Sequence, residues 1–530
     1  MGKPFYHTRT IHADTIQSLI EQSVAKFRKY PWCDYVADGK NVSKSYGDMM
    51  SNIQKIETFM SDAGAKHVGL LGATSYQWLS VMMACLHGGV VVVPLDAQLS
   101  DDDLLYQIEH ADLEILFCDT KFRGLAGKVK KDGKCKIFCY LDEDGEGGLL
   151  HETNKRAGAP YVPPATANKN DLAMIVYTSG TTGVPKGVML SQENLAASAL
   201  YGASVVDVPV GSRLLVILPN NHMYTIGHCF LTLFYFGADM CLNDSIYNTF
   251  NNIKKYKIDL IVAVPAVMRL FKMEIDNQLR SAGYGPLDTL DRIRRALVTA
   301  AIKKKIGSNL NSIVCGGAPL DPSYVHYFKL LGIQLQSGYG MTETAPLISC
   351  QVKDHIDYSR ADSVGQPGVC CEVKIVDGEI RVSGTNVMLG YYKDPESTAE
   401  ALSDGWLKTG DLGHLDDEGF LYITGRKKNL IILGNGENVA PEELEMMFNG
   451  SRNIDGIVVA ANEELDIITA EIHPAKSAVE KMGLEEVQAQ IRQEVKEKNQ
   501  NLPIYKQIKL VTFRDQPFKM TTTMKIKREG

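Results

Sequence analysis

The sequence predicts an α/β protein built from a large N-terminal part, with layered βαβ sheets and a small antiparallel β region, and a small α+β C-terminal domain. Three observations support this fold class. Short apolar runs alternate with helical stretches up to about residue 350, a hairpin pattern occupies residues 372–384, and the pattern changes again from about Arg426. The chain has 530 residues, enough for two to four domains of roughly 150 residues each.

The apolar runs of the first part predict strands that are covered on both faces. They are nearly continuous and bounded by glycine or proline, as strands of a buried parallel sheet usually are. Their alternation with helical stretches implies right-handed crossovers and layered parallel sheets. The predicted strands span residues 67–73, 90–95, 114–119, 173–178, 213–219, 260–265, 312–317 and 334–340.

Residues 76–95 contain no Asp, Glu, Lys or Arg over a length that could cross a bilayer. Gly88 and Gly89 interrupt this stretch, and a valine run ending in Pro94 follows. A buried helix that stops at glycine before a strand explains the pattern better than a continuous span. We therefore expect no integral membrane contact. The first residues also lack the apolar segment of a secretory signal.

The later part of the chain has a different pattern. Asp377-Gly378 separates two alternating apolar runs, which predicts an antiparallel hairpin. Beyond Arg426, Pro441 and the two glutamates after it suit the first turn of a helix. An amphipathic helix is expected through residues 484–495. Strands predicted at 456–461, 467–473 and 508–513 complete a compact α+β unit of about a hundred residues.

Charge and cysteine content narrow the function classes. Lys and Arg total 56 against 63 Asp and Glu, a net charge of −7, which argues against nucleic acid as the main partner. Residues 303–305 form the one notable basic run, and we interpret it as a solvated face. The 11 cysteines are scattered without metal-ligand spacing, which favours reduced thiols in a cytoplasmic enzyme.

Residues 177–187, YTSGTTGVPKG, carry the strongest chemical signal. Its three glycines, Gly180, Gly183 and Gly187, let backbone N–H groups approach an anion, four hydroxyls surround it, and Lys186 adds positive charge. This is phosphate-binding chemistry without the Gly-Lys-Ser/Thr of a Walker A loop. A flexible surface linker would not directly follow a buried strand, so we favour the phosphate loop.

Further segments occur in a fixed order around this loop: LPNNH at 218–222, GGAPL at 316–320, QSGYGMTET at 336–344, DGWLKTGD at 404–411 and GRKK at 425–428. With these motifs the chain closely resembles the adenylate-forming superfamily. That superfamily includes acyl-CoA synthetases, firefly-type luciferases and the adenylation domains of peptide synthetases. The resemblance extends from about Thr15 to the C-terminus.

The resemblance implies that ATP, Mg²⁺ and coenzyme A take part in the reaction. It assigns catalytic roles to His222, Thr342, which would reach the α-phosphate, and Glu343, which would hold Mg²⁺, a cation that prefers oxygen ligands. Tyr339 would stack on adenine, and the ionised Asp411 would accept from the ribose hydroxyls. The implied nucleotide-binding residues are Thr178, Ser179, Gly180, Thr181, Thr182, Gly183, Lys186, Gly317, Ala318, Pro319, Ser337, Gly338, Tyr339, Gly340, Met341, Thr342, Asp411, Ile423, Arg426 and Lys525.

A lysine near the C-terminus completes the implied catalytic set. Lys525 lies in TTTMKIK, residues 521–527, where the family usually has glycine before the lysine and this chain has Met524. Lys519 and Lys527 are therefore competing candidates. The resemblance further implies an adenylation domain at 1–427 and a mobile C-terminal domain at 428–530. The hinge would be Lys428, and Gly434 and Gly436 would line the thiol tunnel.

The implied reaction forms an acyl-adenylate from ATP and a carboxylate, and then transfers the acyl group to a thiol. The segment after His222 has no acid to pair a substrate ammonium, which argues against amino acids. The apolar residues Met223, Tyr224, Ile226 and Met341 suit an acyl tail, and the pattern most resembles medium- to long-chain fatty acyl-CoA synthetases. An aryl acid, a separate acyl carrier protein as acceptor, and an inactive nucleotide-binding homologue stay open, as does the oligomeric state.

Overall fold

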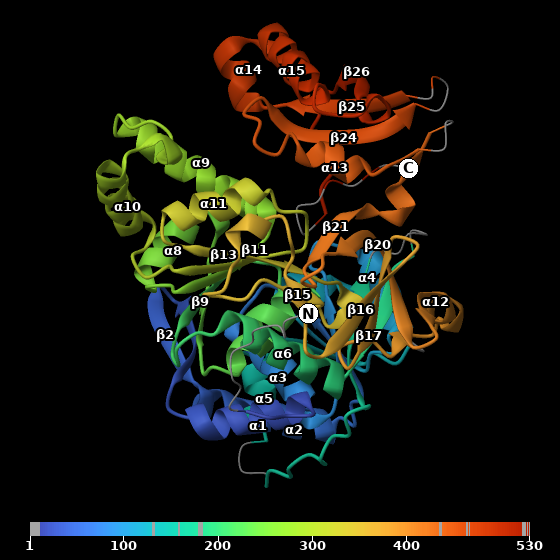
Figure 1. The fold of residues 1–530 in the computed structure, drawn as a ribbon. Helices are drawn as coiled ribbons and strands as arrows, with labels where there is room; N and C mark the ends of the chain where they lie inside the picture. Colours follow the sequence, from blue (N-terminus) through green and yellow to red (C-terminus); the bar gives the residue numbers. More distant parts are fainter. Residues whose placement is uncertain are drawn as a thin grey trace.

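The computed structural model describes residues 11–129, 133–156, 160–178, 184–433, 437–462, 465, 467–521, 526 and 528. Figure 1 shows the N-terminal helices α1 to α3 at the base of the molecule, a lobe formed by α8 to α11 at one side, and the C-terminal elements from α13 onward above them. The predicted α/β class is confirmed, because two mixed sheets with parallel centres are accompanied by a smaller antiparallel sheet.

One sheet contains the strand that leads into the phosphate loop. Neighbouring strands from β7 to β6 are parallel, whereas β8 and β18 add antiparallel pairs at the other side. The strands predicted at 67–73, 90–95, 114–119 and 173–178 are confirmed in this sheet. In spatial order the strands are β18 (Gly390–Tyr391), β8 (Lys186–Ser191), β7 (Leu172–Thr178), β4 (Val91–Leu95), β3 (His67–Leu71), β5 (Ile115–Cys118) and β6 (Ile137–Tyr140).

The second sheet contains the other four predicted strands, which are also confirmed. It is parallel from β13 to β1, and its outer pairs are antiparallel. In spatial order the strands are β15 (Gln366–Pro367), β14 (Ser349–Cys350), β13 (Gln334–Tyr339), β12 (Ser312–Cys315), β11 (Leu260–Ala263), β9 (Arg213–Val216), β10 (Asp239–Leu242), β1 (Pro31–Ala37) and β2 (Lys40–Ser45).

A large hydrophobic core joins both sheets through buried helices. Helix α3 (Tyr76–Gly88) is buried along nearly its whole length, and Gly89 ends it with a left-handed φ of 72°. The charge-free stretch is therefore a core helix followed by β4, as predicted. Among the described residues, no helix combines the length and apolar character needed to cross a membrane. The other helices of this part are α1 (Ile16–Phe27), α2 (Tyr46–Asp62), α4 (Asp101–His110), α5 (Leu149–Asn154), α6 (Gln192–Val206), α7 (Met223–Thr225), α8 (Thr249–Lys255), α9 (Pro265–Ser281), α10 (Arg292–Ile306) and α11 (Pro322–Leu330).

A small antiparallel sheet follows, as the Asp377-Gly378 pattern predicted. Asp377 and Gly378 both have positive φ, 53° and 76°, which suits the tight turn between β16 and β17. Ile380 and Val382 of β17 contribute to a separate small core. The elements here are β16 (Cys371–Val376), β17 (Glu379–Gly384), α12 (Pro395–Ala401), β19 (Leu402–Ser403), β20 (Trp406–Leu415) and β21 (Leu421–Arg426).

The C-terminal unit, by which we mean the described residues from Ile431 onward, has a hydrophobic core of its own. Val459, Ile472 and Ile491 are buried in it. The predicted strands and helices of this unit are confirmed. They are β22 (Ile431–Ile432), β23 (Asn438–Val439), α13 (Pro441–Met446), β24 (Ile454–Asn462), β25 (Ile467–Pro474), α14 (Lys476–Met482), α15 (Leu484–Asn499) and β26 (Ile508–Phe513).

Candidate active site

The two ends of the phosphate loop lie side by side. Thr178 is the last residue of β7, Lys186 is the first of β8, and the two residues are paired across the antiparallel strands. The loop between them is therefore held at both ends by one sheet, which fixes where its backbone begins and ends. The predicted phosphate-binding residues Ser179, Gly180, Thr181, Thr182 and Gly183 lie outside the described residues.

Lys186 is connected to the predicted metal ligand through one aromatic side chain. Its ammonium lies 5.1 Å from the centre of the Tyr391 ring, within the range of a cation–π contact. The Tyr391 hydroxyl donates a hydrogen bond of 2.9 Å to Glu343 Oε1. Strand β18, which carries Tyr391, pairs with β8 next to Lys186. Tyr391 thus joins the lysine of the phosphate loop to the carboxylate of Glu343.

Glu343 lies in a short turn, Thr342–Thr344, directly after β13. Its side chain is buried, and burial raises the pKa of the Glu343 carboxyl above its usual value, while the hydrogen bond from Tyr391 opposes this rise. The Glu343 carbonyl accepts from the backbone N–H of Met388, 2.9 Å away. A buried carboxylate held from two sides is a well-ordered oxygen ligand for a hard cation.

A second cluster contains three of the predicted nucleotide residues. The Tyr339 hydroxyl donates a hydrogen bond of 2.7 Å to Asp411 Oδ2, and Arg426 Nε lies 2.9 Å from Asp411 Oδ1. Asp411 and Arg426 are directly opposite each other on β20 and β21. Asp411 is buried, whereas Arg426 is exposed. Tyr339, at the end of β13, is thereby fixed to the antiparallel sheet.

Ile423 supports the same cluster from β21. It is partly buried and packs, as Tyr339 does, against the small core that includes Ile348 and Ile380. Two strands of different sheets therefore pack against one small core. This arrangement is consistent with the implied role of Ile423 beside the nucleotide, which stays a prediction.

The strand before Tyr339 is held by buried amides. Gln351 Oε1 accepts from the Ser337 backbone N–H at 3.1 Å. Gly338 lies opposite Cys350 of β14. Gly340 requires glycine for steric reasons, since a Cβ there would meet the Pro346 carbonyl oxygen at 1.7 Å. The segment that the resemblance assigns to the nucleotide is thus packed against the β14 strand on one side.

The predicted adenine turn contacts the predicted acyl segment. Gly317 has a positive φ of 80°, and a Cβ at Gly316 would lie 3.3 Å from the Tyr224 hydroxyl and 3.0 Å from the Gly338 carbonyl oxygen. The Tyr224 hydroxyl lies 3.2 Å from the carbonyl oxygens of Ala263 and Val314. Tyr224 therefore fills the space beneath the turn that contains Gly317, Ala318 and Pro319.

The remaining acyl candidates lie on an irregular helix. His222 is the N-cap of α7, and its carbonyl accepts from the Ile226 backbone N–H at 3.0 Å. A π-helix, Ile226–Thr232, follows, a geometry that is frequent at functional sites. A Cβ at Gly227 would meet Pro346 at 2.4 Å, so this helix contacts the segment just after Glu343. Met223 and Ile226 are buried, and Met341 is half-buried.

Two residues that the sequence analysis did not single out belong to this region. Tyr391 contacts both Lys186 and Glu343, and a tyrosine in a short strand carries no local signal of that role. His228 is buried with its ring 4.9 Å from that of Tyr224, and burial lowers the pKa of His228 to about 4. His228 is therefore a neutral imidazole at physiological pH.

The hinge and C-terminal candidates are less completely described. Lys428 is exposed in a short 3₁₀ turn, Lys427–Asn429, between β21 and the C-terminal unit. Gly434, Gly436 and Lys525 lie outside the described residues. Ile526, which follows Lys525, forms an antiparallel bridge with Met520.

Arg528 is attached firmly to the C-terminal unit. It lies 2.7 Å from both carboxylate oxygens of Glu445 and donates to the Val459 carbonyl oxygen at 2.9 Å. One guanidinium nitrogen thus contacts the carboxylate and the other the carbonyl oxygen, which fixes the position of the side chain. The chain is thus anchored three residues beyond Lys525.

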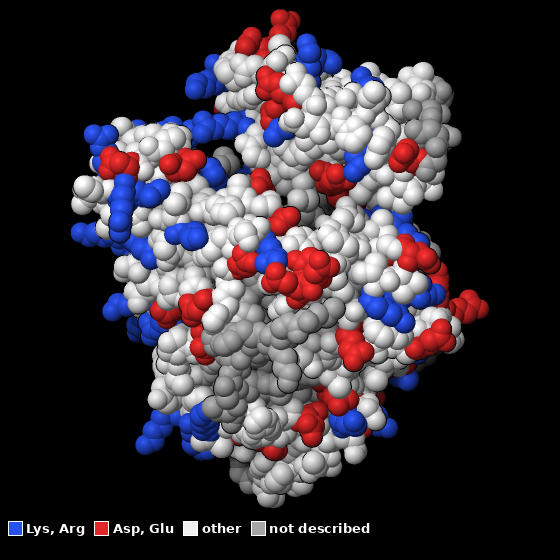
Figure 2. All heavy atoms as spheres, viewed as in Figure 1, with Lys and Arg blue, Asp and Glu red and all other residues white. Residues whose placement is uncertain are grey.

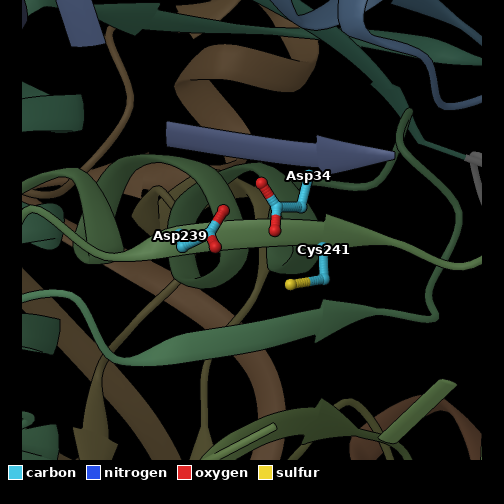
Figure 3. A group of neighbouring side chains, drawn as sticks. All are labelled: Asp34, Asp239 and Cys241. Carbon is cyan, nitrogen blue, oxygen red and sulfur yellow. The ribbon is translucent and has the colours of Figure 1, made fainter. Parts of the chain in front are cut away.

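Asp34, Asp239 and Cys241 form a separate group of side chains on β1 and β10 (Figure 3). Arg213 Nε lies 3.2 Å from Asp239 Oδ2 and Arg213 Nη2 lies 3.5 Å from Asp34 Oδ2. Burial, with the nearby Asp34 charge, raises the pKa of Asp239. The guanidinium and a retained proton balance the two carboxyls, so we assign the group a structural role.

The fold and site define a class of protein. Two mixed α/β sheets place a phosphate-type loop, a buried carboxylate and a Tyr-Asp-Arg cluster around the ends of their strands, and a C-terminal unit with its own core follows. The chain belongs to the AMP-binding enzyme family, whose model matches residues 20–392. A model of the AMP-binding enzyme C-terminal domain matches residues 428–530.

Curated relatives are similar at modest identity. A long-chain-fatty-acid–CoA ligase FadD15 of Mycobacterium bovis is 29% identical over 429 residues, covering 74% of this chain and 71% of the relative. An indoleacetate–CoA ligase of Aromatoleum aromaticum is 28% identical over 433 residues, covering 78% and 79%. A long-chain-fatty-acid–CoA ligase 5 of Rattus norvegicus is 28% identical over 538 residues, covering 87% and 78%.

Solved structures share the fold over nearly the whole chain. The anthranilate CoA ligase AuaEII in complex with anthranoyl-AMP has a TM-score of 0.80 at 18% identity, covering 99% of this chain and 96% of that chain. A Mycobacterium tuberculosis fatty acyl CoA synthetase has a TM-score of 0.68 at 22% identity, covering 97% and 96%. At these identities the structural likeness concerns the fold.

Proposed function

We propose that this protein is an AMP-forming acid–thiol ligase that activates a medium- or long-chain fatty acid and transfers it to coenzyme A. A carboxylate oxygen attacks the α-phosphorus of ATP, the bond to pyrophosphate breaks, and acyl-AMP forms. The thiol then attacks the acyl carbonyl and loses its proton, the bond to AMP breaks, and the products are acyl-CoA and AMP. Family membership and the names of the curated relatives support this reaction.

The observation that carries the proposal is the pair of clusters around β13. Tyr339, Asp411 and Arg426 offer a ring and ribose-binding groups, while Glu343, Tyr391 and Lys186 provide a carboxylate and a cation on the phosphate side. On binding, ribose hydroxyls would replace the Tyr339 hydroxyl at Asp411. Positive groups that are already in place stabilise the charge that develops on the α-phosphate without later reorganisation.

Glu343 is the residue we assign to Mg²⁺. One carboxylate together with phosphate oxygens and water is the usual environment of this cation, and the Glu343 oxygen ligand is buried and hydrogen-bonded from Tyr391. Bound Mg²⁺ would neutralise charge on the phosphates. Thr342 lies in the same turn, and we assign it to the α-phosphate.

Lys525, in the predicted mobile domain at 428–530, is the group we assign to the first half-reaction. Ile526 and Arg528, which follow Lys525 in the sequence, contact Met520 and Glu445 of the C-terminal unit. We further infer that the C-terminal domain rotates about Lys428 between the half-reactions. This rotation would move Lys525 out of the active site and bring in Gly434 and Gly436, which line the thiol tunnel, because one site cannot hold both the lysine and the incoming thiol. Lys519 and Lys527 are the alternatives that mutation must eliminate.

The acyl group is assigned from the residues after His222 and from the relatives. Buried Met223 and Ile226 beside Tyr224 favour an apolar tail. The two long-chain-fatty-acid–CoA ligases among the relatives favour a fatty acid, whereas the indoleacetate–CoA ligase and the anthranilate enzyme favour an aryl acid as the second candidate. Transfer to a separate acyl carrier protein is the alternative for the acceptor.

We also propose a cytoplasmic location. The eleven cysteines, all within the described residues, form no disulfide, and nine of them are buried, as is usual for a protein kept in a reducing compartment. Catalytic residues implied by the family, including Lys186, Glu343, Asp411 and Lys525, are retained, which argues against an inactive homologue.

Carboxylate-dependent exchange of labelled pyrophosphate into ATP tests the first half-reaction without an assumption about the thiol. We expect exchange with fatty acids of one chain-length class and none with amino acids. Product analysis with coenzyme A and with an acyl carrier protein then identifies the acceptor. Exchange with aryl acids alone would select the second candidate, and no exchange with any acid from folded, ATP-binding protein would refute the proposal.

A further inference from the structure

We propose that helix α10 is a peripheral membrane-binding element that lies against the surface of an anionic lipid bilayer. The inference rests on the exposed face of this helix and on the charge around it, and it is independent of the proposed reaction. It also replaces the simple solvated face expected for residues 303–305.

Helix α10 is attached to the protein through one face only. Val298, Ile302 and Ile306 follow each other at intervals of four residues, and all three are buried in the large core. These contacts fix the helix whatever occupies its other side. The C-terminal end is also held, because Gly307 donates its backbone N–H to Lys303 and packs against Ile253 of α8.

The first part of the outward face is apolar, which is unusual for a helix face that no other element of the described chain covers. Ile293 is 74% exposed and Leu297 is 67% exposed. They are one turn apart, and Ala300 continues the same face three residues later. Ordinary solvated helices place polar side chains on this face, so the exposed Ile and Leu indicate contact with something apolar.

Basic side chains border this apolar face on both sides. By helical spacing Arg292 and Lys303 lie along one border and Arg294 and Lys305 along the other, while exposed Lys304 ends the face itself. Lys303 also donates to the Gly332 carbonyl oxygen at 3.1 Å, and Arg294 pairs with Asp291 at 3.3 Å. The helix has six Lys and Arg residues and no acidic residue between Arg292 and Ile306. Long basic side chains beside exposed apolar ones are typical of helices that lie in the interface of a membrane, because their charged ends reach the lipid phosphates.

The charge extends beyond the helix and contrasts with the rest of the molecule. Residues 251–310 contain twelve Lys and Arg against five Asp and Glu, whereas the whole chain has a net charge of −7. In Figure 2 blue side chains predominate along the outer edge of the lobe that Figure 1 assigns to α8, α9 and α10. This separation of charge would orient the molecule toward an anionic surface.

An anionic bilayer fits these observations better than a nucleic acid does. Both would attract the basic border, but only the bilayer has an apolar phase that accepts Ile293 and Leu297. Binding to phosphates alone would not account for the two exposed aliphatic side chains of this helix.

Sedimentation of the full-length protein with lipid vesicles tests the proposal. We expect the protein to sediment with vesicles of phosphatidylcholine and phosphatidylglycerol in equal parts, to stay in solution with phosphatidylcholine alone, and to bind less as salt is raised. The double variant Ile293→Ser, Leu297→Ser should weaken binding by about tenfold. The double variant Arg292→Glu, Lys305→Glu should weaken it similarly and reduce the dependence on salt.

Matched controls come from the C-terminal unit. Ile504 is 78% exposed, and Lys476 is also exposed, so Ile504→Ser and Lys476→Glu should leave binding unchanged. Because Ile293 and Leu297 are exposed, their serine variant should melt at the temperature of the wild type. In addition, the Leu297→Trp variant reports on the environment of this position. Its fluorescence emission, after the wild-type emission is subtracted, should shift to shorter wavelength when anionic vesicles are added.

Three results would overturn the proposal. One is the absence of sedimentation with the anionic vesicles, and another is equal binding by the wild type and the Ile293→Ser, Leu297→Ser variant. The third is a combined result, in which only the Arg292→Glu, Lys305→Glu variant loses vesicle binding and the emission of Leu297→Trp does not shift. That result would assign the basic border to a nucleic acid or an acidic protein instead.

Discussion

The nucleotide-binding clusters and the C-terminal unit are built in different ways. In the clusters, side chains from separate strands or turns are joined in pairs, Tyr339 to Asp411 by a hydrogen bond of 2.7 Å and Tyr391 to Glu343 by one of 2.9 Å. The C-terminal unit has its own hydrophobic core, and its contacts with the rest of the chain include the Arg269 hydrogen bond to Ile454 and the close approach of Ala440 to Gly425. The first arrangement holds a site in one geometry, and the second allows a unit to move as a whole.

Arg269 is the clearest contact between the two regions. From α9 it donates to the Ile454 carbonyl oxygen at 2.8 Å and lies 3.6 Å from Asp455. A partly exposed polar contact of this kind contributes little free energy, so it can break and re-form during a catalytic cycle. Under the proposed function, the groups that stabilise charge are built into the sheets, while the position of the C-terminal unit would select the half-reaction.

Removing the lysine of the C-terminal unit should have the largest effect. Lys525→Ala should lower the rate of pyrophosphate exchange by on the order of a thousandfold, because a cation at the developing charge is lost. Thiolysis of preformed acyl-AMP should stay near the wild-type rate. Lys519→Ala and Lys527→Ala are the controls, and an equal loss in both half-reactions of Lys525→Ala would contradict the assignment.

Gly436→Leu should affect the opposite half-reaction. A side chain in the predicted thiol tunnel should slow thioester formation by about a hundredfold through steric exclusion of the pantetheine arm. Pyrophosphate exchange serves as the internal control and should change little. Normal thioester formation by this variant would show that Gly436 does not line the thiol tunnel.

Glu343→Gln tests the fixed part of the site. The neutral amide should lower adenylation by about a hundredfold and raise the Mg²⁺ concentration needed for half-maximal exchange. Because burial raises the pKa of Glu343, the carboxylate is lost as pH falls through that raised value, and wild-type exchange should fall there. The variant should lack this loss of exchange at low pH. If its Mg²⁺ titration is the same as that of the wild type, another residue binds the cation.

Tyr391→Phe tests the ionisation of Glu343 by removing only the hydroxyl that donates to its carboxylate. The Tyr391 hydrogen bond favours the ionised Glu343 carboxyl, so its removal should raise the pKa further and shift the loss of exchange to higher pH. We expect exchange at neutral pH to fall by about tenfold. Tyr392→Phe is the control, because the Tyr392 hydroxyl donates to Asp112 instead. Identical pH profiles for Tyr391→Phe and the wild type would exclude this coupling.

Arg269→Ala should have the smallest effect. Loss of the contact with Ile454 should change the ratio of the two half-reaction rates by about two- to threefold, with both reactions retained. Arg280→Ala, on the same helix and exposed, is the matched control. Equal rate ratios for both variants would show that this contact does not favour either position of the C-terminal unit.

Local patterns were sufficient for most elements. The apolar runs before Thr178 and Tyr339, the Asp377-Gly378 turn and the glycine that ends α3 each encode their structure within a few residues. Short strands such as β10 and β18 were not predicted, because they depend on neighbours that are distant in sequence. Arg213 and Asp239 illustrate this, since their ion pair exists only when β9 and β10 are adjacent.

The sequence by itself determined the phosphate loop, the order of the nucleotide motifs and the family, since these depend on residue types at short spacing. Only the tertiary structure decided that Tyr391 joins Lys186 to Glu343, that Tyr339 meets Asp411, and that Ile293 and Leu297 face outward. Hydrogen bonds act over about 3 Å, and burial depends on what covers a residue. Neither can be read from the chain before distant segments are brought together.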